Sequence, residues 1–174
     1  ENTSTAPDVG SSYWTQLGSD MDGENFGDQF GYSVSLSSDG TIVAIGAKLN
    51  DGVNEDKSRI GQVKVYKYIG TSWTQLGSDI DGEAIDDYSG NSVSLSSDGT
   101  IVAIRAHLND GNGNNSGHVR VYEYKIPSTD EWANGNVIKG GDTSQENSKN
   151  YWTQLGSDIN GEESEDYSGR SVSL

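Results

Sequence analysis

Three acidic segments, here called the acidic linkers, carry the residues whose types and spacing could hold a metal ion. They read DMDGENFGD at residues 20–28, DIDGEAIDD at 79–87 and DINGEESED at 158–166. Oxygen-bearing side chains recur at positions 1, 3, 5 and 9 of each linker. Calcium takes about six to eight oxygen ligands from flexible loops, so this spacing predicts Ca2+ as a cofactor. The candidate ligands are Asp20, Asp22, Glu24, Asp28, Asp79, Asp81, Glu83, Asp87, Asp158, Asn160, Glu162 and Asp166.

The glycine at position 4 of each acidic linker supports a different interpretation. In an EF-hand calcium loop the required glycine stands later, so these segments are not EF-hand loops. The pairs Asp22-Gly23, Asp81-Gly82 and Asn160-Gly161 are typical of tight turns, which would leave the neighbouring acids solvated. At the level of sequence, a calcium site and a set of turns both remain open.

Side chains suited to nucleophilic or general-base catalysis are few. The chain has no cysteine, and His107 and His118 are its only histidines. A second copy of the surrounding sequence has Lys48 and Gln62 at these two places, which predicts that both histidines are surface substitutions. No histidine recurs together with a serine and an acid, so the sequence predicts that the protein is not an enzyme.

An internal repeat provides the elements that must position these residues. WTQLGSD stands at 14–20, 73–79 and 152–158, and SLSSDGTIVAI stands at 35–45 and again at 94–104. The two copies of the longer motif are 59 residues apart. Repeats of this length that consist of short strands are typical of propeller blades and β-solenoids.

Each repeat contains four segments with strand character. In the first repeat they are SVSLS at 33–37, TIVAIGA at 41–47, GQVKVYKY at 61–68 and WTQLG at 73–77, and the second repeat matches. Four antiparallel strands form the blade of a β-propeller, and two blades cannot close a ring. The predicted fold is therefore all-β, with propeller-type blades in tandem that form an open or partial propeller.

The repeat also divides the chain. Residues 1–12 are predicted to be a flexible leader, and 13–72 a leading strand followed by blade 1. Residues 73–151 are blade 2, whose last connection, 125–150, is either decoration or a partner-contacting loop anchored by Trp132. Residues 152–174 begin a third repeat.

Charge restricts the classes of partner. The chain has 27 acidic and 11 basic residues, and its net charge of −16 repels nucleic acid and anionic membrane surfaces. We therefore predict no nucleic-acid partner and no membrane insertion, since no apolar run reaches membrane-spanning length. Asn2 and Asn114 each begin an N-glycosylation acceptor pattern, which predicts a glycoprotein.

Two further residue types bear on how the blades pack. Tryptophan recurs at 14, 73 and 152, which predicts core or inter-blade packing rather than a sugar-stacking platform. Arg105 stands where the first repeat has Gly46. It either ends its strand at a solvent-exposed rim or pairs with a carboxylate of a neighbouring blade or subunit.

The first repeat resembles a known family. GDQFGYSVSLSSDG at 27–40, VAIGA at 43–47 and GQVKVYKY at 61–68 resemble an FG-GAP repeat, the blade unit of integrin-α-type β-propellers. The resemblance extends over most of 14–124 and over 152–174. The repeat also resembles the WTQLGSDIDGE repeats that occur in tandem in large predicted surface proteins. Integrin-type blades hold calcium between their first and second strands, but Ser38–Gly40 is too short for that loop.

These observations together predict a non-enzymatic structural or adhesive repeat protein, located outside the cell or on its surface. The chain would be a segment or protomer of a larger surface or filamentous assembly, held by self-association or by neighbouring repeats. The alternative is a propeller binding module for a glycan or protein, with calcium as a possible requirement. A metal-dependent propeller hydrolase that uses clustered carboxylates is the third alternative.

Overall fold

The computed structural model describes residues 14–52, 59–126 and 151–174. The predicted leader, the acceptor Asn2 and the loop residue Trp132 lie outside these ranges. Within them the chain forms ten strands and no helix. The predicted all-β class is therefore confirmed for the described part of the chain.

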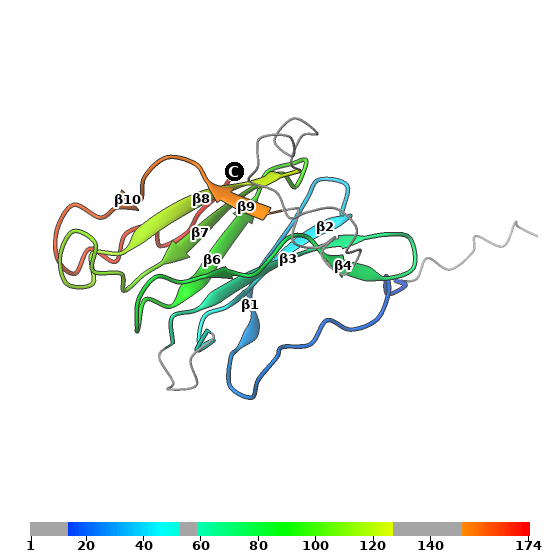
Figure 1. Ribbon diagram of the computed structural model, residues 1–174, viewed down its shortest axis with the longest axis horizontal. Coiled ribbons are helices and arrows are strands. Elements are labelled where there is room, and N and C mark those ends of the chain that lie inside the picture. Colours follow the sequence, from blue (N-terminus) through cyan, green and yellow to red (C-terminus); the bar gives the residue numbers. More distant parts are fainter. Residues whose placement is uncertain (1–13, 53–58, 127–150) are drawn as a thin grey trace, which may run out of the picture.

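The strands form two antiparallel sheets that correspond to the two predicted blades and lie side by side without closing a ring (Figure 1). In both sheets the order of the four main strands follows the chain. Blade 1 contains β1 (Phe30–Leu36), β2 (Ile42–Ala47), β3 (Gln62–Tyr68) and β4 (Trp73–Gln75). Blade 2 contains β6 (Ser89–Leu95), β7 (Ile101–Ala106), β8 (His118–Lys125) and β9 (Tyr151–Gln154).

Two very short strands were not predicted, and both lie inside acidic linkers. Strand β5 (Ile80–Asp81) pairs with β3, and β10 (Ile159–Asn160) pairs with β8. The second and third linkers are therefore fixed by backbone pairing against the third strand of the blade that precedes each of them. This pairing sets the position of the linker carboxylates.

The β1–β2 and β6–β7 hairpins turn at the predicted Ser-Asp-Gly sequence. Asp98 accepts hydrogen bonds from the Ser96 hydroxyl and from the backbone N–H of Thr100, at 2.6 and 3.0 Å. These bonds stabilise the carboxylate and lower the pKa of Asp98 to about 2. Gly99, which follows it, has φ +73°, the left-handed conformation that glycine adopts without strain.

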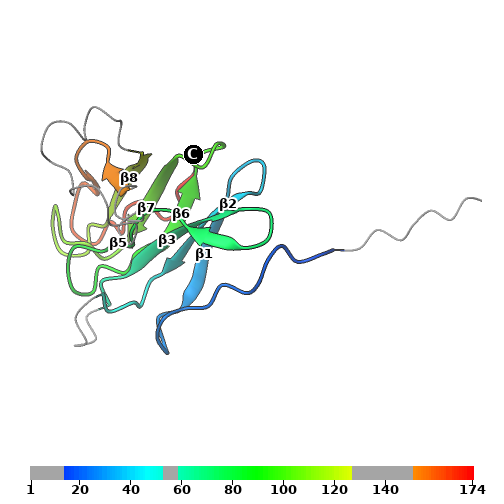
Figure 2. The ribbon, with the colours of Figure 1, turned by 45° about the vertical axis from the view of Figure 1, so that its right-hand side comes forward.

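The hydrophobic core lies between the two blades, where β6 packs on β1 and β2 (Figure 2). Side chains alternate across a sheet, so each blade has two faces. We call the face that packs on the preceding blade the leading face and the opposite one the trailing face. The leading face of blade 2 contributes Val93, Leu95, Val102, Ile104 and Tyr122, and the trailing face of blade 1 contributes Ala44, Val63, Val65 and Ile80.

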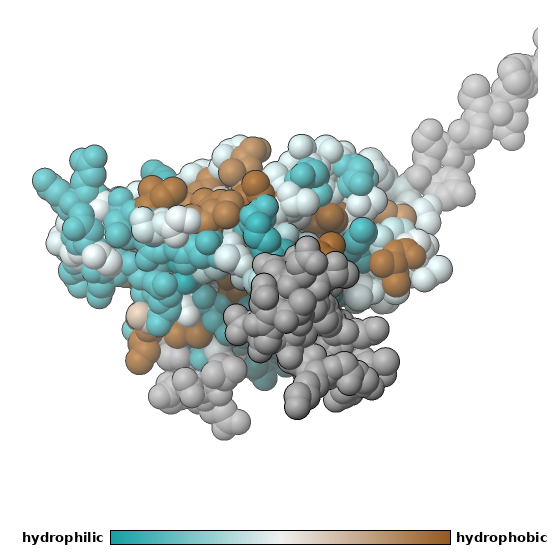
Figure 3. Space-filling model, turned by 45° about the horizontal axis from the view of Figure 1, so that its top comes forward, coloured by the Kyte–Doolittle hydropathy of each residue, from teal (hydrophilic) through white to brown (hydrophobic). Residues whose placement is uncertain are grey.

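The two outer faces of this pair are open in part, although residues 167–174 already lie against the trailing face of blade 2. Val34 and Leu36 on the leading face of blade 1 are each 56% exposed, whereas their counterparts in blade 2 are buried. On the trailing side, Ile80 is 5% exposed and its counterpart Ile159 is 60% exposed. Apolar side chains are therefore visible among hydrophilic ones on the molecular surface (Figure 3).

The contacts between successive repeats recur at corresponding positions. The indole N–H of Trp73 donates to the carbonyl of Leu17 at 2.7 Å, and that of Trp152 donates to the carbonyl of Leu76 at 2.9 Å. The predicted core or inter-blade packing is thus confirmed for Trp152, which packs against the core, whereas the bond of Trp73 goes to the segment before blade 1. Trp14 is fully exposed.

The segment at 14–17 is not a strand, although a leading strand was predicted from residue 13 onward. The corresponding WTQ segments of β4 and β9 pair with β3 and β8, the third strands of the blades before them. Among the described residues no third strand precedes 14–17, and the corresponding strand pairing is not formed there.

Candidate functional site

Three side chains from distant parts of the sequence meet at the joint between the two blades. Glu83 lies in the acidic linker between β5 and β6, His118 begins β8, and Asp158 immediately precedes β10. Asn160 of β10 pairs with His118 of β8, and this register carries Asp158 to the imidazole. Among the described residues, these three form a group that could hold a metal ion.

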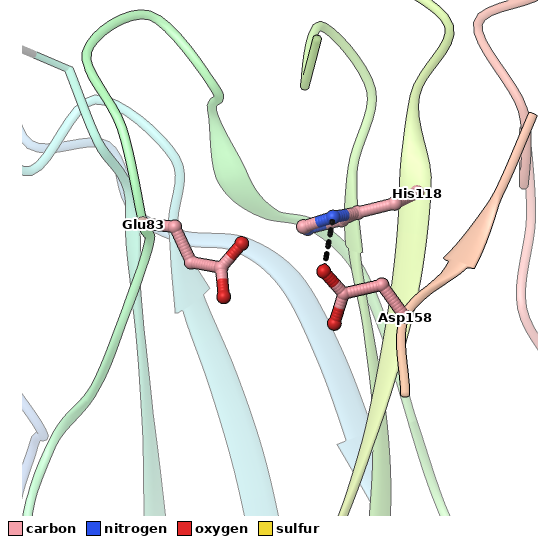
Figure 4. A group of neighbouring side chains, drawn as sticks. All are labelled: Glu83, His118 and Asp158. Atoms are coloured by element: carbon pink, nitrogen blue, oxygen red, sulfur yellow. Dashed lines mark ion pairs between the residues drawn. The ribbon is translucent and has the colours of Figure 1, made fainter. Parts of the chain in front are cut away.

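The geometry of this group centres on a buried imidazole. His118 is 1% exposed, and its Nδ1 lies 3.6 Å from Oδ2 of Asp158, too far for a hydrogen bond. That nitrogen has no hydrogen-bond partner. One ligating atom of each residue lies within 4.8 Å of the others, and both carboxylates point toward the ring (Figure 4).

The electrostatics of the group favour the neutral form of the imidazole. Burial lowers the pKa of His118, and the charge of Arg120 lowers it further, while Asp158 and Glu83 act in the opposite direction. Arg120 itself is buried, and its Nη1 pairs with Oε1 of Glu83 at 2.9 Å. A neutral imidazole is the form that binds metal ions.

Blade 1 has a different arrangement at the corresponding position. There Gln62 replaces the histidine, and its Nε2 donates to Asp79 at 3.2 Å and to Asp81 at 3.0 Å. Lys64, which corresponds to Arg120, pairs with Glu24 and lies 3.5 Å from Asp79. The amide therefore hydrogen-bonds to both carboxylates, whereas Nδ1 of the imidazole in blade 2 has only the 3.6 Å ion pair with Asp158 and no hydrogen bond.

The prediction that both histidines are surface substitutions is wrong for His118, and His107 is only partly exposed. His118 is buried, and His107 is half-buried against the ring of Tyr88, with centroids 5.3 Å apart. Differences between repeat copies do not distinguish surface from interior. His118 lies against Asp158 of the following linker and His107 against Tyr88, so their environment depends on contacts between residues that are distant in the sequence.

A pH dependence follows from the burial of His107. Burial, with the charges of Arg105 and Lys48, lowers the pKa of His107 to about 4, against roughly 6.5 in an unfolded chain. Between these values the unfolded chain binds more protons, so the stability of the fold is lost as pH falls from about 6.5 toward 4.

Replacing His107 by glutamine should make the decrease in unfolding free energy between pH 6.5 and 4.5 smaller by about 1 kcal/mol. This figure allows for solvent screening of a half-buried ring. Urea unfolding of both proteins at pH 6.5 and 4.5 measures the effect. Equal losses of unfolding free energy in the wild type and the variant would contradict it.

The acids at position 9 of the linkers have structural partners. Asn50 donates to Asp28 and Asn109 donates to Asp87, both at 2.8 Å and both buried. Burial raises the pKa of Asp87, against the effect of this hydrogen bond. Both asparagines belong to the repeated LNDG motif. The recurrence of this motif was the sequence feature that could have indicated these partners. In the third linker, Asp166 accepts from two backbone N–H groups of its own turn.

The acids at position 1 are held by the glutamine of WTQLGSD. In all three copies the amide of this glutamine donates to the aspartate four residues later. The three bonds are Gln16 to Asp20 at 2.8 Å, Gln75 to Asp79 at 2.7 Å and Gln154 to Asp158 at 2.7 Å. The remaining predicted ligands, Asp22, Asn160 and Glu162, are exposed. Calcium binding by the linkers stays a prediction.

The Asp-Gly and Asn-Gly pairs of the second and third linkers are not turns. Asp81 and Asn160 end strands β5 and β10. Gly82 then donates its N–H to the carbonyl of Gly61, and Gly161 donates to that of Gly117, both at 2.8 Å. Glycine is needed here because the backbone of another segment lies against the Cα, not because a turn requires it.

Arg105 differs from both predictions made for it. Its side chain is 5% exposed rather than at a solvent rim, and its acceptors are not carboxylates. Nε donates to the carbonyl of Ser168 at 2.9 Å and Nη2 to that of Tyr167 at 2.6 Å. Nη1 donates to the Asn91 side chain at 2.7 Å. Arg105 thus connects blade 2 to the beginning of the third repeat.

The acceptor Asn114 lies in the connection between β7 and β8 and is exposed. Its carbonyl accepts from the N–H of Glu165, and Ser116, which completes the pattern, is buried. A glycan on the Asn114 side chain would therefore extend into solvent without displacing core residues. Glycosylation at Asn2 and Asn114 stays a prediction.

Comparison with known proteins identifies the repeat. Residues 20–66 match the family model of the FG-GAP repeat. This match confirms the resemblance for the first repeat and indicates a β-propeller-type binding or adhesive module. No curated protein matches the chain. Within the described residues, no helix has the length and apolar character needed to cross a membrane.

Proposed function

We propose that this protein is a non-enzymatic structural or adhesive repeat protein of the extracellular space or cell surface. Its blades stack on further blades, which belong either to neighbouring repeats of the same chain or to other copies. The FG-GAP match in residues 20–66 supports an adhesive module of propeller blades. The exposed acceptor Asn114 is consistent with passage through a secretory pathway.

One observation carries the proposal: the contacts between successive units repeat. The backbone N–H of Leu95 donates to the Ser35 hydroxyl at 2.9 Å. At the next joint the N–H of Leu174 donates to the Ser94 hydroxyl at 2.9 Å, two residues that correspond to Leu95 and Ser35. A contact that recurs between units can be continued, and interfaces of this heterologous kind produce rings or filaments.

The open faces are suited to that continuation. Val34 and Leu36 would become buried if a preceding blade packed on them as blade 1 packs on blade 2. Ile159 would become buried under a following blade, as Ile80 is. The net charge of −16 opposes association between copies, and salt screens that repulsion.

The chain is therefore expected to associate increasingly as protein concentration and ionic strength rise. Sedimentation velocity from low to high salt measures this. Leu36→Asp, which places a charge on the leading face, and Ile159→Asp, on the trailing face, should each leave the chain monomeric, because every copy then lacks the same one of the two faces that must meet. Ile69→Asp is the matched control, because Ile69 is 60% exposed in the β3–β4 connection.

Mixing the two face variants makes the test specific. Each variant keeps one intact face, so an equimolar mixture should form mixed pairs that cannot grow further. A monomer at every concentration and salt would overturn association between copies. Equal loss of association in Ile69→Asp would show that the aspartate acts through charge alone.

A further inference from the structure

We propose that Glu83, His118 and Asp158 bind one divalent transition-metal ion, with zinc preferred, at the joint between the two blades. The site shares Glu83 and Asp158 with the calcium ligands expected within single acidic linkers, but it combines them across two linkers. It takes one residue from each of two linkers and adds an imidazole from β8.

The buried imidazole is the first argument. Nδ1 of His118 has no hydrogen-bond partner, and the residue is 1% exposed. An unsatisfied polar atom in the interior costs free energy unless something occupies its lone pair or proton. The carboxylates of Glu83 and Asp158 face the same ring (Figure 4). A cation bound between them would therefore give Nδ1 of His118 the partner that it lacks.

The donor set points to zinc rather than calcium. Calcium takes oxygen ligands, whereas imidazole nitrogen combined with carboxylate oxygen suits zinc and its neighbours among the transition metals. Three protein ligands leave a fourth position for water, as in many zinc sites. Oε1 of Glu83 already pairs with Arg120, which leaves its other carboxylate oxygen for the ion.

Blade 1 is an internal comparison for this site. Gln62 occupies the position of His118, and its amide hydrogen-bonds to both neighbouring carboxylates of the linker. The glutamine therefore completes the polar cluster without a cation. His118 at the same position in blade 2 makes no corresponding hydrogen bond through Nδ1. That nitrogen is therefore available to a metal ion, whereas the Gln62 amide is not.

The bound ion would connect separate parts of the fold. Glu83 belongs to the connection that enters blade 2, whereas Asp158 belongs to the linker that leaves it. An ion held by both, and by β8, would stabilise the folded state by mass action because the unfolded chain does not bring the three ligands together.

The test is titration of the full chain with Zn2+, prepared without a histidine tag, by calorimetry or by competition with a chromophoric chelator. The wild type should bind one Zn2+ with a dissociation constant in the micromolar range. His118→Gln should weaken binding by about 10- to 100-fold. Saturating zinc should raise the melting temperature of the wild type by about 5 °C, and the same zinc concentration should raise that of the variant by a clearly smaller amount.

Two controls separate this site from general attraction to an acidic protein. His107→Gln removes the other histidine and should leave zinc affinity unchanged. Millimolar Ca2+ should not displace zinc, and Co2+ bound to the wild type should give visible absorption bands that His118→Gln lacks. His118→Gln carries the residue that blade 1 has at this place, so it should fold. Circular dichroism and urea unfolding verify this.

The proposal is overturned if the wild type binds no zinc, or if His118→Gln binds zinc as tightly as the wild type does. The second result would mean that surface carboxylates alone hold the ion. Glu83→Gln and Asp158→Asn then provide an independent check, because each should weaken zinc binding in a protein that keeps its imidazole.

Discussion

Replacing Gly82 by alanine is expected to lower the free energy of unfolding by about 3 kcal/mol, because the added methyl group overlaps backbone atoms. A Cβ at this position would lie 1.9 Å from the carbonyl oxygen of Ile60 and 2.7 Å from its carbonyl carbon. The N–H of Gly82 is also hydrogen-bonded to Gly61 at 2.8 Å, so the linker cannot move away without losing that bond. Urea unfolding followed by tryptophan fluorescence measures the loss.

Gly156→Ala is the control for this experiment. Gly156 has φ +71°, but no atom lies within 4 Å of the position its Cβ would take. Its replacement therefore tests the cost of the left-handed conformation alone, about 1–2 kcal/mol. Gly82 lacks that conformation, so its cost comes from the close approach. A loss for Gly82→Ala no larger than that for Gly156→Ala would contradict the predicted overlap.

The sequence predicted the main strands well because their signal is local. In β2 and β7 an apolar run is bounded by Ser-Asp-Gly on one side, and the same run recurs 59 residues later. Period-2 alternation in SVSL placed β1 and β6 in the same way. Two copies of one pattern also fix the register, since a slip in either would expose its apolar residues.

The candidate site could not be predicted in the same way. Strands β5 and β10 contain two residues each, too few for any periodicity, and yet they position Asp81 and Asp158. The burial of His118 depends on blade 1, which packs on the leading face of blade 2. The only sequence feature related to this burial was the difference between Gln62 and His118 at a repeated position. Such a difference is equally compatible with an exposed position.

The same reasoning applies to Arg105. In blade 1 the corresponding Gly46 lets blade 2 approach closely, and a Cβ there would lie 2.2 Å from the carbonyl oxygen of Gly90. In blade 2 the guanidinium occupies the corresponding space and donates to Ser168, Tyr167 and Asn91. The two joints are therefore built differently, although the repeats that form them are nearly identical.

Replacing Arg105 by alanine should release the third repeat from blade 2. Two carbonyl groups would lose charge-assisted hydrogen bonds, and the expected cost is about 3 kcal/mol. Amide hydrogen exchange at Ser168, whose N–H donates to Ser116 at 2.8 Å, should then accelerate about a hundredfold. The N–H of Gly61, bonded to Asn50 within blade 1, serves as the reference and should not change.

Arg105→Lys distinguishes the two contributions of this side chain to the joint. Lysine keeps the positive charge but has a single ammonium group, which cannot reach the three acceptors that the planar guanidinium serves at once. If directed hydrogen bonds hold the third repeat, exchange at Ser168 in Arg105→Lys should approach the rate in Arg105→Ala. If exchange stays at the wild-type rate in both variants, the guanidinium does not hold this joint. The docking of residues 167–174 would then rest on other contacts, such as the bond from the N–H of Leu174 to the Ser94 hydroxyl.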